Sequence, residues 1–277
     1  MTIREALRAA QERLEAAGVP EAGLDAELLL AFALHEDRLR MRLDGQRALP
    51  EAALDRYEAL VVRRETREPL QYIEGEAPFM GLTFTVAPGV LIPRQDTEIL
   101  CEEALSCLRP GMRVLDIGTG SGALAVSLAK LGGARMTAAD VSDAALAIAQ
   151  ENAKRNGADV RFVKSDCFEA LAGERFDMIV SNPPYIDAQE MAELMPEVRR
   201  EPELALFGGL DGLDYYRRIA AQAPAHLAHG GWLLFEIGWK QREPVCALMR
   251  AHIGEPFACR DYGGNWRVVG AQLRSDD

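Results

Sequence analysis

From Arg113 onward, short apolar segments alternate with segments of helical periodicity, and this alternation limits the possible folds more than any other feature of the chain. Strands are predicted near 113–117, 135–140, 160–165, 175–181 and 231–237, and helices near 121–131, 143–156 and 213–228. Two further strands are predicted at 256–261 and 265–273. Such alternation is typical of a parallel sheet with helices on both faces. The sequence therefore predicts an α/β domain built on a mostly parallel sheet.

The amino-terminal residues 1–68 do not alternate in this way and read as helices with short connections. Thr2 and Glu5 have the spacing of a capping box, and apolar residues follow at helical intervals. Pro50 suits the first turn of a later helix that runs to about Thr66. Nothing in this segment has a catalytic pattern. It is predicted to form a small helical domain that recognises a partner.

Residues 69–95 separate the helical segment from the alternating one. Apolar residues surround Gly81, and Pro88-Gly89 forms a turn before a second apolar run at 90–93. This pattern predicts a β-hairpin linker. The α/β domain is then expected to span 96–277, with its first helix starting near Asp96.

Composition places the chain among ordinary globular proteins. Of its 277 residues, 48% are hydrophobic and 27% are charged, and no apolar stretch approaches the length of a membrane span. The five cysteines include no Cys-x-x-Cys pair and are expected to be reduced thiols, as in cytoplasmic proteins. The four histidines have no acidic or thiol partners in a ligand pattern, so no metal site is expected. The expected state is a cytoplasmic monomer without membrane association.

The net charge of −12 bears on the choice of substrate. Proteins that grip duplex DNA or folded RNA usually display a basic surface, because phosphate contacts supply most of the nonspecific affinity. The acidic balance argues against a nucleic-acid substrate, although a local basic patch would be compatible with it. No direct nucleic-acid partner is expected.

The segment from Val114 to Gly122 has the pattern of a strand that enters a glycine-rich turn and then a helix. Glycines allow a tight turn, and the amino end of a helix offers unpaired N–H groups to an anion. Asp140 ends the next strand, where an acidic residue reaches ribose hydroxyls in dinucleotide folds. Together these features predict a site for an adenosine-containing cofactor. The loop alone fits NAD as well as S-adenosylmethionine.

The remainder of the chain favours S-adenosylmethionine, because no acid/base pair for hydride transfer follows the loop. In that site Asp116 would meet the methionine ammonium group and Asp140 the ribose, although both carboxylates could instead serve as helix caps or turn residues. The segment 166–168 should border the adenine. The candidate cofactor-binding residues are Asp116, Gly118, Thr119, Gly120, Ser121, Gly122, Asp140, Cys167 and Asn182.

The run Asn182-Pro183-Pro184-Tyr185 follows an apolar strand and carries the most specific chemistry of the chain. Two consecutive prolines cannot continue a sheet ladder, so the strand must end there. The Asn182 amide oxygen and the Pro183 carbonyl then offer two acceptors, and Tyr185 offers a flat face. These groups would bind a planar group that bears an NH2. Asn182, Pro183 and Tyr185 are the candidate catalytic residues, and Pro184 joins them in the candidate substrate site.

With the glycine loop, this run resembles the class I S-adenosylmethionine-dependent methyltransferases that modify planar amino groups, whose Rossmann-like domain has a mostly parallel sheet. Longer stretches resemble one family among them, the peptide chain release factor glutamine N5-methyltransferases (the PrmC/HemK family). These stretches are Arg67–Gly75, Pro88–Arg94, Asp96–Glu98, Glu201–Leu206, Glu236–Gln241 and Arg260–Asn265. The resemblance covers the chain from about residue 67 to the end, and the amino-terminal helices fit in kind.

This resemblance implies methyl transfer from S-adenosylmethionine to the side-chain amide nitrogen of a glutamine in a release factor, with S-adenosylhomocysteine as the product. It also implies that the glycine loop, Asp140, Cys167 and Asn182 hold the cofactor. Two positions depart from the family pattern: Gln95 stands where proline is frequent, and Cys167 where many relatives have Trp or Leu. A methyltransferase for a ribosomal-protein glutamine, and one for DNA or RNA amino groups, are the alternatives.

Overall fold

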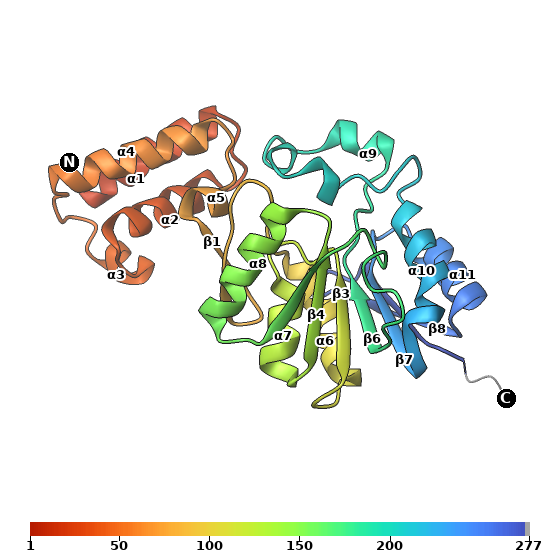
Figure 1. Ribbon diagram of the computed structural model, residues 1–277. Coiled ribbons are helices and arrows are strands. Elements are labelled where there is room, and N and C mark those ends of the chain that lie inside the picture. Colours follow the sequence, from red (N-terminus) through yellow and green to blue (C-terminus); the bar gives the residue numbers. More distant parts are fainter. Residues whose placement is uncertain (275–277) are drawn as a thin grey trace. The chain divides into compact units, whose positions relative to one another are not determined.

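The computed structural model describes residues 1–274, which fall into two compact units. One unit comprises Met1–Gly75 and Met195–Arg200, and the other comprises Glu76–Leu194 with the chain from Glu201 onward. The first unit is helical, and the second holds the large sheet (Figure 1). Among the described residues, no helix is both long enough and apolar enough to cross a membrane.

The helical unit has a single apolar core to which its longer helices contribute. Its helices are α1 (Ile3–Ala16), α2 (Ala22–Leu34), α3 (Arg38–Leu43), α4 (Glu51–Glu65) and α5 (Leu70–Glu74), with the short η1 (Val198–Arg200) from the later segment. The predicted capping box is confirmed, because Glu5 N donates to Thr2 Oγ1 at 3.3 Å and Thr2 N donates to Glu5 Oε2 at 2.8 Å.

Buried ion pairs explain why residues 195–200 belong to the helical unit. Arg64 of α4 donates to Asp25 Oδ2 at 2.7 Å and to Glu197 Oε1 at 2.9 Å. Arg67 donates to both oxygens of Glu197 at 2.6 Å. Burial would raise the pKa of Glu197, but the bonds from Arg67 and Arg64 outweigh it and lower that pKa to about 2. The carboxylate therefore stays charged and keeps the segment bound.

The second unit contains a seven-stranded sheet in the order β5-β4-β3-β6-β7-β9-β8. Its strands are β3 (Arg113–Ile117), β4 (Arg135–Asp140), β5 (Val160–Lys164), β6 (Phe176–Ser181), β7 (Leu227–Glu236), β8 (Pro256–Arg260) and β9 (Trp266–Gln272). The first five run parallel, and β9 pairs antiparallel with both β7 and β8. The predicted α/β fold with a mostly parallel sheet is confirmed.

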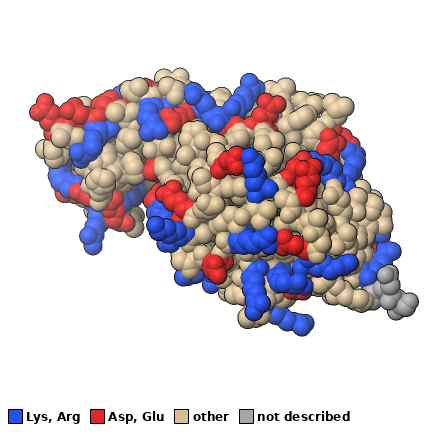
Figure 2. Space-filling model, viewed as in Figure 1, with Lys and Arg blue, Asp and Glu red and all other residues tan. Residues whose placement is uncertain are grey.

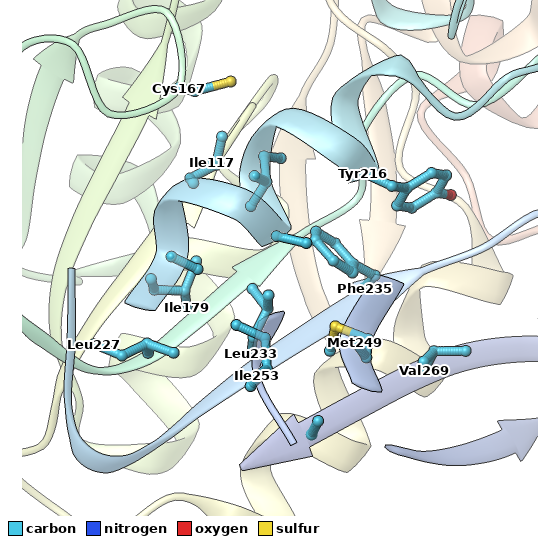
Figure 3. Close-up of a cluster of buried hydrophobic side chains, with 14 of the residues drawn as sticks. Ile117, Cys167, Ile179, Tyr216, Leu227, Leu233, Phe235, Met249, Ile253 and Val269 are labelled. Carbon is cyan, nitrogen blue, oxygen red and sulfur yellow. The ribbon is translucent and has the colours of Figure 1, made fainter. Parts of the chain in front are cut away.

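Helices pack apolar side chains against both faces of this sheet. The helices of the unit are α6 (Gln95–Cys107), α7 (Ala123–Gly132), α8 (Asp143–Asn156), α9 (Ala188–Glu193), η2 (Glu203–Ala205), α10 (Asp214–His226) and α11 (Arg242–His252). One core cluster joins the sheet to α6 and α7, and a second joins it to α10 and α11. Figure 3 shows the second cluster, in which Tyr216 and Met249 of these helices lie beside Phe235 and Val269 of the strands.

The hairpin occupies less of the linker than the sequence predicts. It consists of β1 (Glu76–Phe79) and β2 (Leu82–Thr85), and its turn lies at Met80 and Gly81, with φ of 49° and 74°. Positive φ at both central residues is the geometry that tight hairpins require. The prediction of a strand after Pro88-Gly89 is wrong, because Ile92 N donates to Glu201 Oε2 at 3.0 Å instead of joining a ladder.

Charges of both signs are interspersed on the face of the molecule in Figure 2. A hollow at the amino ends of the parallel strands is lined by four arginines: Arg113, Arg135, Arg161 and Arg175. Arg161 pairs with Glu174 at 2.6 Å, and Arg113 pairs with Asp177 at 3.5 Å. This local basic patch is thus partly neutralised by ion pairs.

Asn152 of α8 connects the hairpin to the loop after β3. Its side chain is fully buried, and its Nδ2 donates to Thr85 O at 2.9 Å and to Ser121 O at 2.8 Å. Its Oδ1 accepts from Thr85 N at 2.6 Å. One amide thus satisfies three backbone groups of two segments that are far apart in the sequence.

Replacing Asn152 with Ala is expected to lower the free energy of unfolding by about 2–4 kcal/mol, because three backbone groups lose their partner in the interior. Urea unfolding followed by circular dichroism measures the loss. The matched control is Asn265→Ala at an exposed turn, which should cost less than about 0.5 kcal/mol. Equal losses in the two variants would contradict the role of Asn152.

Candidate functional site

A cleft opens at the carboxyl edge of the sheet, where the parallel strands end. The space between its walls, open solvent included, is about 860 Å³. The sheet contributes residues that follow four strands: Gly118 and Gly120 after β3, Asp140 of β4, Cys167 after β5 and Asn182 after β6. Sites in open α/β sheets lie at this edge, where the strand order reverses. The reversal here lies at β3, whose neighbours are β4 and β6.

The loop after β3 leaves room for a ligand. Gly118, Gly120 and Gly122 have φ of 74°, 54° and 82°, a backbone conformation that favours glycine. No atom lies within 4 Å of the position that a Cβ would take at Gly118 or Gly120, and both residues line the cleft. At Gly122 a Cβ would lie 3.0 Å from the Cβ of Ala149, so this glycine allows α7 and α8 to pack closely.

Asp140 lies at the edge of the cleft with its carboxylate oriented by backbone amides. Its Oδ2 accepts from Gly120 N at 2.9 Å, and its Oδ1 accepts from Ser142 N at 2.9 Å. A carboxylate has about four acceptor positions, so capacity remains for two ribose hydroxyls. The strand end, the glycine loop and this acid therefore fit an adenosine-containing group.

Asp116 lies behind the loop and not on the cleft wall. It is 1% exposed, and its Oδ2 accepts from Thr119 Oγ1 at 2.7 Å. Its Oδ1 has no hydrogen-bond partner among the described residues. Burial raises the pKa of Asp116 to about 7, although the bond from Thr119 opposes the rise. Thr119, Ser121 and Gly122 likewise lie outside the lining of the cleft.

The segment after β5 divides between the cleft and the core. Asp166 and Cys167 line the cleft, whereas Phe168 stacks on His226 with ring centroids 4.4 Å apart. Phe168 does not line the cleft, because its ring completes the core against α10. Cys167 has φ of 50°, which is uncommon for a residue with a side chain. Burial raises the pKa of its thiol to about 11.

Three residues of the Asn-Pro-Pro-Tyr run line the cleft, and the fourth does not. Asn182, Pro183 and Pro184 line the cleft, and Asn182 Nδ2 donates to Thr97 Oγ1 at 3.1 Å. Tyr185 does not line it: its ring borders a neighbouring hollow beside Trp239, and its hydroxyl donates to Glu236 Oε1 at 3.3 Å. The tyrosine therefore holds the end of the run against the sheet. The sequence instead predicts that its ring would offer a flat face to the substrate.

One wall of the cleft comes from segments whose role the sequence pattern alone does not reveal. Residues 89–91 and Pro202, Leu204 and Ala205 line it. Glu201 joins the two segments, because its buried carboxylate accepts from Ile92 N at 3.0 Å and from Arg94. Both segments lie in stretches whose sequence resembles the family, and this resemblance could have indicated that they belong to the site.

The backbone of the run is also held from behind by close packing. At Gly208 a Cβ would lie 2.6 Å from Pro184 O and 2.7 Å from Tyr185 Cα. At Gly212 it would lie 2.3 Å from Tyr185 O. Gln241 Nε2 donates to that same carbonyl oxygen at 2.9 Å. The run therefore has little room to move away from the cleft.

Both parts of the chain match models of known protein families. Residues 5–75 match the family model of the PrmC N-terminal domain, and residues 93–199 match that of the Methyltransferase small domain. In solved structures the fold resembles a methyltransferase from Pyrococcus furiosus, with a TM-score of 0.56 and 21% identity over 71% of this chain and 91% of that one. It also resembles the 16S rRNA N2 methyltransferase of T. thermophilus in complex with AdoMet and guanosine, with a TM-score of 0.55 and 24% identity over 72% and 50% of the two chains.

The sheet order and the cleft at its carboxyl edge therefore define a class I methyltransferase fold. Several curated relatives named release factor glutamine methyltransferase match nearly the whole chain. The protein of Geobacter sulfurreducens is 46% identical over 98% of this chain and 97% of its own length. That of Cereibacter sphaeroides is 48% identical over 99% of both, and that of Moorella thermoacetica 45% over 100% of both. The chain belongs to the release factor glutamine methyltransferase family, which confirms the resemblance seen in the sequence.

Replacing Gly208 with Ala is expected to lower the free energy of unfolding by about 1–3 kcal/mol, because the added methyl group meets backbone atoms of the run and forces a shift. Chemical denaturation measures this loss. In the control Gly45→Ala the new Cβ meets nothing closer than 3.7 Å, so its cost should be smaller. If Gly208→Ala were as stable as the unaltered protein, the close packing would not constrain the run.

Asp116 predicts a pH dependence of stability. An acid whose pKa is higher in the folded state stabilises the fold below its unfolded pKa, and this contribution is lost as pH rises to the folded value. For Asp116 the loss runs from about pH 4 to about pH 7, and the shift from 3.8 to about 7 corresponds to roughly 4 kcal/mol at most.

Asp116→Asn should remove this loss, so the stability of the variant relative to the unaltered protein should rise between pH 4 and pH 7. Thermal unfolding at a series of pH values measures it, and the difference at pH 4 serves as the reference. A constant difference across this range would show that Asp116 is ionised in the fold throughout.

Proposed function

We propose that the protein transfers a methyl group from S-adenosylmethionine to the side-chain amide nitrogen (N5) of a glutamine in peptide chain release factors. The observation that carries this proposal is the orientation of Asn182. Its Nδ2 donates to Thr97, so its Oδ1 remains available as an acceptor, and both Asn182 and Pro183 line the cleft. Two adjacent acceptors suit the two hydrogens of an NH2 group.

The residues of the cleft fit the proposed cofactor. Asp140 would accept from the ribose hydroxyls, and the loop at Gly118 and Gly120 would approach the methionine part with its open backbone. Cys167 and Asp166 would border the adenine. Asp116 would act from behind the loop. Its Oδ1 has no hydrogen-bond partner among the described residues and would accept a hydrogen bond from the methionine ammonium group. When bound, S-adenosylmethionine supplies an electrophilic methyl group on a cationic sulfur.

A glutamine amide needs orientation because its nitrogen lone pair is delocalised into the carbonyl. The Asn182 oxygen and the Pro183 carbonyl would accept the two N–H bonds and direct the lone pair toward the methyl group. The nitrogen would form its bond to carbon as the bond to sulfur breaks, and the amide would then lose a proton to solvent. Most of the acceleration would come from positioning and electrostatics, without a strong general base.

Tyr185 would contribute by fixing the end of the run, since its hydroxyl is bound to Glu236. The helical unit would contribute recognition of the release factor, because a single glutamine offers too little surface for a specific complex. The support for a release factor as substrate is the naming of the relatives that match the chain over nearly its whole length.

Replacing Asn182 with Ala is expected to lower kcat by about 100-fold or more, because one of the two acceptors that orient the amide is lost. Mass spectrometry of a release factor incubated with enzyme and S-adenosylmethionine measures turnover. Calorimetric titration with S-adenosylhomocysteine should show binding within about tenfold of the unaltered protein. The control Asn265→Ala should leave both unchanged. Near-normal turnover in Asn182→Ala would contradict the proposed chemistry.

Parallel incubations with labelled S-adenosylmethionine distinguish the possible substrates. Separate pools of release factors, ribosomal proteins and DNA should yield label on release factors, at a glutamine. Label confined to ribosomal proteins would identify the nearest alternative, and label confined to DNA would overturn the assignment to a protein substrate.

A further inference from the structure

Glu236 lies directly behind the Asn-Pro-Pro-Tyr run. It ends β7, the neighbour of β6, and the pairing of Ser181 with Phe235 places it opposite Asn182. Its side chain is 1% exposed, and its Oε1 accepts from the Tyr185 hydroxyl at 3.3 Å. Its Oε2 has no hydrogen-bond partner within residues 1–274. A buried carboxylate without full pairing is costly, and such groups occur where function requires them.

Thr97 lies between Glu236 and Asn182. It comes from the first turn of α6 and is buried, and its Oγ1 accepts from Asn182 Nδ2 at 3.1 Å. Burial raises the pKa of the Glu236 carboxyl to about 7, and the nearby Thr97 hydroxyl opposes this rise. Arg267 also lowers that pKa, and Asp96 raises it.

The direction of these bonds follows from their protons. In its ionised form the Glu236 carboxylate can only accept, and a threonine hydroxyl has one proton and two lone pairs. If the Thr97 proton is directed to Glu236, a lone pair remains for Asn182. An amide that faces a lone pair must present its NH2 end, so its oxygen is turned to the opposite side, toward the cleft. The amide would be free to present either end if Thr97 had no acidic partner.

The same carboxylate therefore acts on both ends of the run. It holds Tyr185 directly and Asn182 through Thr97, while Gln241 holds the Tyr185 carbonyl and the Tyr216 hydroxyl donates to Glu236 O at 2.9 Å. The two prolines between these ends have no N–H to contribute. The position of the run therefore depends on side chains that pack behind it and bind its two ends.

We propose that Thr97 and Glu236 are positioning residues that set the orientation of the Asn182 amide: Glu236 receives the Thr97 and Tyr185 protons, and Thr97 receives the Asn182 NH2, which leaves the Asn182 oxygen for the substrate. This inference rests on the proposed function, in which that oxygen orients the glutamine amide. Neither residue lines the cleft.

Substitutions at Thr97 separate its hydroxyl from its volume. Thr97→Val keeps the shape and removes the hydrogen bonds, so kcat should fall about 10–100-fold, while KM for S-adenosylmethionine stays within about twofold. Thr97→Ser keeps the hydroxyl and should recover most of kcat. The matched control is Thr137→Val, a buried threonine of β4 outside the cleft, which should leave kcat unchanged.

Glu236→Gln separates positioning from folding. The neutral amide can donate to Thr97 and so release the orientation of Asn182, so kcat should fall about tenfold or more. The variant should nevertheless be at least as stable as the unaltered protein at pH 7, because a buried carboxyl with a raised pKa is removed. A loss of kcat in proportion to a loss of stability would contradict the proposal.

A spectroscopic measurement tests the hydrogen bond without any turnover. The chain contains four asparagines, Asn152, Asn156, Asn182 and Asn265, so selective ¹⁵N labelling gives few side-chain NH2 signals. The Asn182 pair, identified by its absence in Asn182→Ala, should shift in Thr97→Val and in Glu236→Gln and return in Thr97→Ser. The signals of Asn152 and Asn265 should not move.

The outcomes are distinct. Unchanged Asn182 signals in Thr97→Val, kcat within twofold of normal in that variant, or equal loss in Thr97→Ser would each overturn the proposal. If the unaltered protein failed to methylate any release factor glutamine, the proposed function would be wrong, and the labelled amide signals would still decide the orientation of Asn182.

Discussion

A hydrogen bond between two strand ends joins the segments that build the two sides of the cleft. Ser181 Oγ donates to the Ile117 carbonyl oxygen at 2.7 Å, across the parallel pair β3 and β6. Beyond this bond, β3 continues into the glycine loop and β6 continues into the Asn-Pro-Pro-Tyr run. Because β3 lies where the strand order reverses, its helix and that of β6 leave on opposite faces and a cleft opens between the loops. The register of this pair fixes the distance between the two loops.

Much of the sheet could be predicted from the sequence, because buried parallel strands read as continuous apolar runs between turn residues. The strand ends then had to share one edge, and this places Gly118, Gly120, Asp140, Cys167 and Asn182 around a single cleft. Less regular elements were not predicted. Helix α11 and the short α9 were missed, and the hairpin is shorter than expected because Glu201 takes the N–H of Ile92.

Local patterns could not show which residues turn away from the cleft. Asp116 and Tyr185 belong to the right segments, but the packing behind each segment decides the direction of the side chain. Asp116 faces Thr119 inside the loop, and Tyr185 faces Glu236 across β7. Thr97 lies 85 residues from Asn182 in the sequence, and Glu236 lies 51 residues from Tyr185, so no short motif joins them to the run. Their contribution depends on tertiary structure.

Cys167 illustrates how burial changes the chemistry of a residue at the edge of a cleft. The residue is 5% exposed, and burial raises the pKa of its thiol to about 11, so almost none of it is thiolate at neutral pH. Since the thiolate is the reactive form, this cysteine is a poor nucleophile toward electrophiles and oxidants. Covalent inhibitors directed at this thiol would react slowly for the same reason.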